Sequence, residues 1–296
     1  MGLLHILILA VVQGLAELLP VSSSAHVIVA AKLLGLPPIS KPEMTLLLVM
    51  LHTGTMFAVI LYFWRAWRKS LFASRAVFKQ QAIRLIVATI LTGAVGAPLI
   101  KGIEKGVEKS GYLVKSPGGE PQKAEIELLF DNLGLVAGAL AAAGVLILFA
   151  GLTERAAARN REIGIREAAW IGAVQGLCLP FRGFSRSGAT ISTGLLLGAL
   201  KARVEEFSFA LAVIITPAAI GREVWRLVRA HREAGHFDVT WSLFGPDLFG
   251  MVCAFLAGLL ALKWLSRWLE GGRWYLFGIY CLCAASVVFV LHCRGY

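Results

Sequence analysis

The segment GFSRSGAT, residues 183–190, places a guanidinium, three hydroxyl groups and two glycines inside a strongly apolar part of the chain. The runs on either side, residues 168–179 and 191–200, have the apolar composition of membrane helices. A charged side chain at membrane depth is costly, so such residues pair with a partner or mark a functional site. We therefore expect Arg186 to have a functional role, with the rest of the chain arranged around this segment.

The composition of the 296-residue chain predicts a membrane protein. Its hydrophobic fraction is 57% and its charged fraction 16%, whereas soluble domains have about 45–50% apolar and about 25% charged residues. Backbone groups in lipid need internal hydrogen bonds, which favours helices. The net charge of +11 comes from Lys and Arg between apolar segments, which is typical of solvated loops and lipid headgroup contacts. We expect an all-α polytopic membrane protein that binds no nucleic acid.

Two pairs of short apolar runs flank polar segments. Residues 3–12 and 27–36 form the first pair, and residues 168–179 and 191–200 form the second. Each run is shorter than the roughly 20 residues that span a bilayer, so each pair predicts a re-entrant hairpin whose polar tip is surrounded by protein or water. Six longer runs are predicted to cross the membrane: residues 46–64, 85–100, 133–152, 207–220, 248–264 and 275–292.

The order of these elements repeats along the chain. The sequence VQGL occurs at residues 12–15 and again at residues 174–177, each time before a serine cluster. One hairpin plus three spans is an odd number of crossings, so the second copy enters the bilayer upside down, and the two hairpins are predicted to enter from opposite faces and meet near the midplane. We predict a single membrane domain, residues 1–296, built as an inverted-topology repeat. Its halves, about 1–153 and about 165–296, each contain one re-entrant hairpin and three transmembrane helices.

Basic residues between the apolar runs predict an orientation. Six Lys and Arg residues at 65–84, with no acidic residue among them, are placed in the cytoplasm by the positive-inside rule. Residues 101–127 are then external, and the arginines at 155–166 are again cytoplasmic. Four arginines at 222–232 fall outside in this arrangement, against the rule.

The first tip contains a carboxylate that needs a partner. Gln13 and Glu17 are four residues apart and share a helix face. An acid inside an apolar hairpin has to find a proton, a cation or a metal ion. Glu17 is therefore a candidate ligand for a divalent ion, which Mg²⁺ sites build from a carboxylate and substrate phosphate, or a candidate proton acceptor. A hydrogen bond that only packs the helices is the alternative.

A cluster of hydroxyl groups and an imidazole follows Glu17. Ser22, Ser23, Ser24 and His26 supply nucleophile and base types within five residues, and a serine needs a neighbouring base to attack at neutral pH. Capping of the following helix is the structural alternative for the serines. Farther along, His52, Thr53 and Thr55 either line the same cavity or hold helices together, and the sequence does not choose between these roles.

The second tip has the features of an anion site. Gly183 and Gly188 let backbone approach a ligand, and a helix beginning after Gly188 offers free amides. Arg186 presents a planar fork of donors that matches phosphate oxygens, and Thr190 adds a hydroxyl from the first turn. Arg182 either contacts the ligand or extends toward the membrane surface.

Residues 13–26 and 183–190 closely resemble the signature segments of the bacterial undecaprenyl-diphosphate phosphatases, the bacitracin-resistance family. The likeness extends to residues 205–209 and to the order of the apolar segments. It implies removal of the terminal phosphate from C55 polyprenyl diphosphate, giving the monophosphate carrier of cell-wall synthesis. It also implies a divalent cation and a site open to the periplasm in the bacterial inner membrane. Arg182-Gly183 stands where the family usually has Pro-Gly, which bears on the shape of the second loop.

The resemblance also implies roles for individual residues. The acidic motif of the family falls on Gln13 and Glu17, its serine and histidine on Ser23 and His26, and its Ser-Arg pair on Ser185 and Arg186, followed by Thr190. We predict that Glu17, Ser23, His26 and Arg186 are catalytic, and that Gln13, Ser22, Ser185, Ser187, Gly188 and Thr190 bind the substrate. Glu17, with Gln13, is the predicted site for Mg²⁺, with Ca²⁺ as the alternative ion.

Three chemical routes stay open on this reading. Ser23 attacks phosphorus with His26 as its partner, His26 attacks directly, or a metal-held water attacks. The rival function is a polyprenyl-lipid transporter or flippase, because inverted repeats with broken helices are common in transporters. Carrying a lipid requires Arg186 but not Ser23 and His26 together, so we favour the enzyme. A homodimer is an open alternative to a single copy.

Overall fold

The chain is almost entirely helical over the residues that the structure describes. The computed structural model describes residues 2–37, 42–109, 132–154, 161–233 and 241–295. Within these ranges the only β-contact is an isolated bridge between Arg161 and Ala199. The helices are α1 (Leu3–Leu18), α2 (Ser23–Leu33), α3 (Pro42–Ser70), α4 (Arg75–Lys109), α5 (Leu133–Glu154), α6 (Ile165–Cys178), α7 (Arg186–Leu196), α8 (Lys201–Glu233), α9 (Trp241–Glu270) and α10 (Trp274–Cys293).

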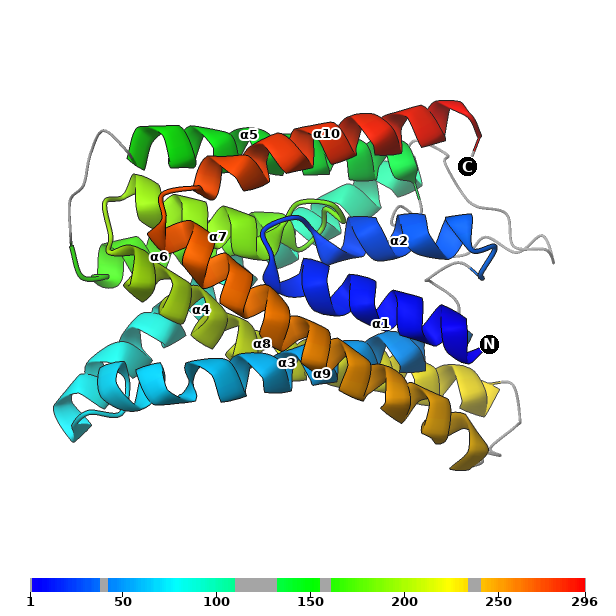
Figure 1. The fold of residues 1–296 in the computed structure, drawn as a ribbon, viewed down its shortest axis with the longest axis horizontal. Coiled ribbons are helices and arrows are strands. Elements are labelled where there is room, and N and C mark those ends of the chain that lie inside the picture. Colours follow the sequence, from blue (N-terminus) through cyan, green and yellow to red (C-terminus); the bar gives the residue numbers. More distant parts are fainter. Residues whose placement is uncertain (1, 38–41, 110–131, 155–160, 234–240, 296) are drawn as a thin grey trace.

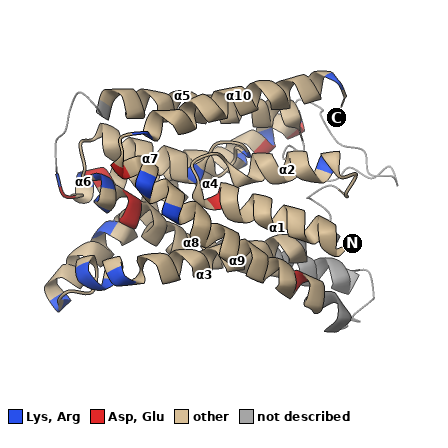
Figure 2. Ribbon diagram, in the orientation of Figure 1, with Lys and Arg blue, Asp and Glu red and all other residues tan. Residues whose placement is uncertain are grey.

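Six of these helices are long and apolar enough to cross a bilayer: α3, α4, α5, α8, α9 and α10. Each contains one of the six predicted spans. Figure 2 shows long stretches of helix without charge, with Lys, Arg, Asp and Glu gathered mainly toward helix ends. The other four helices have 11 to 16 residues, less than a bilayer requires. The prediction of an all-α polytopic membrane protein is therefore confirmed.

The short helices lie in the middle of the bundle. Figure 1 shows α5 and α10 side by side along one edge and α3, α8 and α9 toward the opposite edge. Between these edges, the pair α1–α2 and the pair α6–α7 run in from opposite ends. Residues 19–22 join the first pair and residues 179–185 join the second. Each joint together with the adjoining helix turns is called a tip below, the first tip between α1 and α2 and the second tip between α6 and α7. The two tips meet near the centre of the bundle, where the Gly183 amide donates to Ser24 Oγ at 3.3 Å.

Small residues let the short helices pack closely on their long neighbours. A methyl group added to Gly14 of α1 would lie 2.6 Å from the Ala254 carbonyl oxygen of α9. One added to Gly176 of α6 would lie 2.8 Å from the Thr92 carbonyl oxygen of α4. Lipid tails are as apolar as the side chains, so there is no hydrophobic driving force between helices in a membrane. Close van der Waals packing of small residues is therefore a main source of helix association there. Both VQGL glycines therefore fix a hairpin against a spanning helix.

The structure differs from the predicted loops because several spanning helices continue beyond the apolar runs. α3 continues to Ser70 and α4 begins at Arg75. The basic residues at 65–84 therefore lie on the last turns of α3 and the first turns of α4, and only a short turn separates the two helices. α4 also extends to Lys109, into the predicted external loop. The remainder of that loop from residue 110, and the arginines at 155 and 159, lie outside the described residues.

Candidate active site

Glu17 lies in the last turn of α1, at the first tip, with 16% of its side chain exposed. Gln13, one turn earlier and buried, donates from Nε2 to Glu17 Oε2 at 3.1 Å. The predicted shared face of these two residues is confirmed. The amide therefore orients the carboxylate toward the centre of the bundle.

A left-handed residue turns the chain sharply at the first tip. Ser22 has a φ of 68° and caps α2, where its Oγ accepts from the Ala25 amide at 3.5 Å. A non-glycine residue in this region carries strain of about 1–3 kcal/mol, and such strain clusters at functional sites. The turn brings Ser23, the first residue of α2, back onto α1. Ser23 Oγ donates to Glu17 Oε2 at 2.5 Å.

The second tip depends on a glycine and on a serine cap. Gly183 has a φ of 104°, and an added Cβ would lie 2.4 Å from the Val136 carbonyl oxygen, so only glycine fits. Ser185 caps α7, and its Oγ accepts from the Gly188 amide at 3.2 Å. The expected helix start after Gly188 is therefore wrong, because α7 begins at Arg186 and the Gly188 amide is already bonded. Serine is a stronger N-cap than glycine, because its hydroxyl accepts a hydrogen bond from an amide at the helix start that has no partner within the helix.

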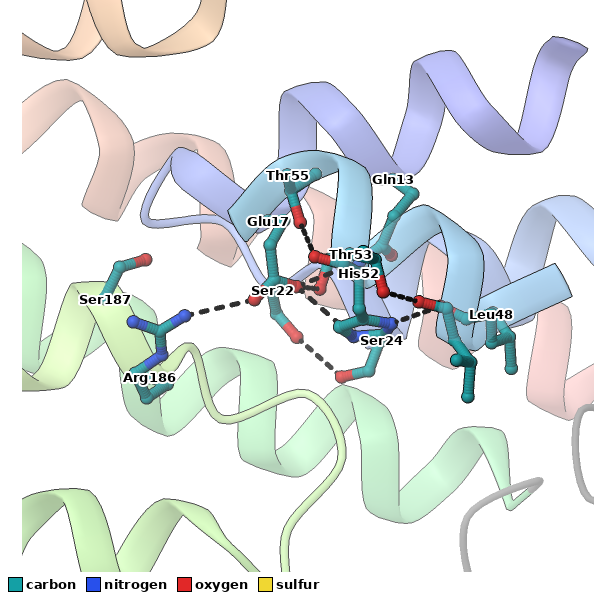
Figure 3. Close-up of polar contacts among 12 residues, drawn as sticks. Gln13, Glu17, Ser22, Ser24, Leu48, His52, Thr53, Thr55, Arg186 and Ser187 are labelled. Carbon is teal, nitrogen blue, oxygen red and sulfur yellow. Dashed lines mark hydrogen bonds and ion pairs between the residues drawn. The ribbon is translucent and has the colours of Figure 1, made fainter. Parts of the chain in front are cut away.

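The two tips join through Arg186 and Glu17, which are 169 residues apart in the chain. Arg186 Nη2 donates to Glu17 Oε1 at 3.1 Å. Ser187 Oγ donates to the Leu19 carbonyl oxygen at 3.2 Å, a second bond between the tips. Figure 3 shows Arg186 reaching Glu17 from one side, with Gln13 and His52 on the other. Glu17 is therefore the counter-ion of Arg186.

Arg186 keeps donors for a further partner. Its side chain is 23% exposed, and the buried Nη1 has no hydrogen-bond partner among the described residues. A buried donor without an acceptor costs about 1–3 kcal/mol, more when the group is charged. Phosphate oxygens match the guanidinium fork in both geometry and charge. The arrangement therefore offers an anion a donor that no acceptor among the described residues occupies.

The other polar residues of the second tip are buried and hold the tip together. Ser185, Ser187 and Thr190 are 3% exposed or less. Thr190 Oγ1 donates to the Arg186 carbonyl oxygen at 2.8 Å and lies 2.6 Å from Ser208 Oγ. These bonds anchor the first turn of α7, which carries Arg186. Direct contacts of these residues and of Gly188 with a substrate stay predictions.

His26 has partners other than Ser23. Its Nδ1 lies 2.8 Å from the Ser22 carbonyl oxygen and its Nε2 lies 2.7 Å from the Tyr280 hydroxyl. The expected pair of Ser23 and His26 is not among the hydrogen bonds of the described residues, in which Ser23 instead donates to Glu17. Sequence reasoning missed Tyr280 because it lies in the last apolar span with no motif around it.

The structure gives different roles to the three polar residues of α3 that were candidates for lining the cavity, His52, Thr53 and Thr55. His52 Nε2 lies 3.7 Å from Glu17 Oε2, and its Nδ1 donates to the Leu48 carbonyl oxygen at 2.7 Å. Thr53 and Thr55 bond to carbonyl oxygens of their own helix, at 2.7 Å and 2.9 Å. His52 therefore belongs to the site, whereas the two hydroxyls satisfy the backbone of α3.

Known proteins match this chain over nearly its whole length. The family model described as Bacitracin resistance protein BacA matches residues 6–287, which include both tips. The chain belongs to the BacA family. "Undecaprenyl-diphosphatase 2" of Acinetobacter baylyi is 56% identical over 293 residues, 98% of each chain. "Undecaprenyl-diphosphatase" of Thermus thermophilus is 35% identical over 95% of this chain and 94% of its own length, and that of Rhodopirellula baltica is 30% identical over 99% of both.

The donor set of this BacA-family site fits a cation that arrives with a substrate. No cluster of three or more His, Cys, Asp or Glu side chains occurs among the described residues. Glu17 is the carboxylate of the site, with the Gln13 amide beside it and Arg186 already paired to it. Mg²⁺ is commonly held by one or two carboxylates together with substrate phosphates and water. The donors of this site among the described residues fit that mode.

Proposed function

We propose that this chain hydrolyses the terminal phosphate of undecaprenyl diphosphate to give undecaprenyl phosphate. The observation that carries the proposal is the meeting of Glu17, Ser23 and Arg186 at the two tips, with an unfilled donor on Arg186. Family membership and the names of the relatives support the same substrate. The reaction recycles the lipid carrier of cell-wall synthesis, at a periplasm-facing site in the bacterial inner membrane.

Ser23 is the nucleophile in this proposal, and Glu17 is its base. Ser23 Oγ forms a bond to the terminal phosphorus while the bond from phosphorus to the bridging oxygen breaks, and undecaprenyl phosphate leaves. The hydroxyl proton moves to Glu17 Oε2, which lies 2.5 Å away. Arg186 binds the phosphoryl oxygens and stabilises the charge that they carry in the transition state.

Water completes the reaction by hydrolysing the phosphoserine. Its oxygen attacks phosphorus and its proton moves to the Nε2 lone pair of His26, while Ser23 Oγ leaves and recovers the proton from Glu17. His26 then releases its extra proton to solvent, which restores the neutral ring for the next turnover. Nδ1 of His26 donates to a carbonyl oxygen, so Nε2 carries the lone pair of the neutral ring. Direct attack by this nitrogen is the second route. It gives an acid-labile phosphohistidine where the serine route gives an acid-stable phosphoserine.

We also propose that the two halves form an inverted repeat with re-entrant hairpins. Exchanging the halves pairs α1 with α6, α3 with α8, α4 with α9 and α5 with α10. The packing of α1 on α9 then becomes the packing of α6 on α4, and both occur. The packing of α5 on α10, and of α3 on α8, is unchanged by the exchange and also occurs. The VQGL glycines support the same symmetry, since Gly14 lies against α9 and Gly176 against α4.

The decisive experiment measures phosphate release by the purified protein in lipid vesicles that contain undecaprenyl diphosphate. We expect stoichiometric release of inorganic phosphate and formation of undecaprenyl phosphate. The inverted repeat favours a lipid transporter as the rival function, so movement of the diphosphate between leaflets is measured in the same vesicles. Lipid movement without phosphate release would establish the transporter and reject the phosphatase.

A divalent cation, Mg²⁺ or alternatively Ca²⁺, is proposed to bind with the diphosphate, held by Glu17 and the Gln13 amide oxygen. When bound, the ion neutralises phosphate charge. Chelation with EDTA is expected to lower turnover by at least about 10-fold, and excess Mg²⁺ to restore it. The melting temperature of lipid-free protein is expected to be the same with and without EDTA, because no resident ion is removed. Full turnover in EDTA would exclude the cation.

A further inference from the structure

Both nitrogens of His26 are held in the described structure. The Ser22 carbonyl oxygen accepts from Nδ1 at 2.8 Å, because a carbonyl can only accept. Nε2 of the neutral ring is therefore an acceptor, and the Tyr280 hydroxyl, 2.7 Å away, donates to it. The planes of the two rings are nearly parallel, with an interplanar angle of 11°. The ring is thus fixed in its plane, its direction and its tautomer.

α10 contacts the first tip at a second point beside Tyr280. The Cys281 thiol donates to the Pro20 carbonyl oxygen at 3.3 Å. Two successive residues of α10 therefore contact the first tip. Tyr280 bonds to His26 at the start of α2, and Cys281 bonds to the turn between α1 and α2. Tyr280 is nevertheless 48% exposed. The tyrosine is thus not a buried packing residue, and its bond to His26 lies at an accessible edge of the site.

The geometry points to Tyr280 as a positioning residue for the reaction, acting through His26. This inference rests on the proposed function. The hydroxyl keeps the Nε2 lone pair aimed in one direction and unprotonated before the substrate binds. A phosphoryl oxygen or the attacking water then takes the place of the hydroxyl beside Nε2, so the ring need not reorient. A catalytic group misplaced by about 1 Å can lose about 10²-fold in rate.

The test is a double-mutant cycle on undecaprenyl diphosphate hydrolysis. Tyr280→Phe keeps the ring and removes the hydroxyl, and it is expected to lower kcat by about 10-fold to 100-fold with KM within about twofold of wild type. His26→Ala is expected to lose more. The double variant Tyr280→Phe/His26→Ala is expected to be no slower than His26→Ala alone, because Tyr280 acts only through the imidazole.

A matched control separates the loss of His26 positioning from a general effect of removing a tyrosine hydroxyl from the helix bundle. Tyr62→Phe on α3 removes a hydroxyl that donates to Ser266 Oγ at 3.0 Å, away from His26, and it is expected to keep kcat within about twofold. Melting temperatures of all variants are measured alongside. Wild-type kcat in Tyr280→Phe, or losses that multiply in the double variant, would overturn the inference. Absence of hydrolysis by the wild type would instead reject the proposed function.

Discussion

Arg186→Lys is expected to lower kcat/KM for undecaprenyl diphosphate by about 10³-fold while the protein stays folded. Arginines that stabilise a transferred phosphoryl group contribute about 10³–10⁵ to the rate. Lysine keeps the positive charge beside Glu17 but is a point charge. Lysine lacks the two arms of a planar fork, so it cannot bond Glu17 and a phosphate oxygen at once in that geometry. In Arg186, Nη2 donates to Glu17, and Nη1 has no partner among the described residues and is the donor proposed for phosphate. Phosphate release from vesicles measures the loss.

Arg203→Lys is the matched control for this substitution. Arg203 also forms ion pairs, with Glu162 and Glu206 at 3.3 Å, but it lies at the start of α8 and is 38% exposed. Exposed pairs of this kind contribute about 0–1 kcal/mol, so the control is expected to keep kcat/KM within about twofold and to melt like wild type. If Arg186→Lys behaved like Arg203→Lys, phosphate binding by the guanidinium would be excluded.

The meeting of the two tips could be predicted from the sequence because each tip carries its own local signal. A charged residue in an apolar segment needs a partner, and Glu17 and Arg186 were the strongest such residues. Their ion pair at 3.1 Å is the simplest solution for both. The six spans follow equally directly from apolar length. The predicted start of α7 after Gly188 is wrong because the Ser185 hydroxyl caps the helix three residues earlier.

The pairing inside the site could not be predicted, because it depends on backbone geometry and on distant residues. His26 follows Ser23 by three residues, a spacing that suggests a contact. The left-handed conformation of Ser22 instead turns Ser23 toward Glu17 and leaves the imidazole bonded to the Ser22 carbonyl oxygen. Tyr280 lies 254 residues from its partner. A polar residue on an apolar span, without a motif, is equally consistent with a helix contact.

Glu17→Gln is expected to lower kcat by about 10³-fold, because the amide cannot accept the Ser23 proton. A positioned general base contributes about 10²–10⁴ to a rate. KM is expected to change little, because the neutral amide frees Nη2 of Arg186 for phosphate but weakens the binding of the cation that Glu17 shares with the substrate. Glu206→Gln on α8 is the matched control, because it also removes a carboxylate paired with an arginine, and it is expected to keep kcat within about twofold. A rise in KM with unchanged kcat would assign Glu17 to binding and not to proton transfer.

Ser23→Ala decides whether Glu17 acts through the serine. If Ser23 is the nucleophile and Glu17 its base, the two act as a unit, and removing either one removes most of what both contribute. The kcat of Ser23→Ala is then expected to be about 10³-fold below that of wild type. The kcat of the double variant Ser23→Ala/Glu17→Gln is expected to be no lower than that of the slower single variant. Losses that multiply to about 10⁶-fold would mean independent roles. Glu17 would then act on a water or on the cation, and the 2.5 Å bond from Ser23 would only orient the carboxylate.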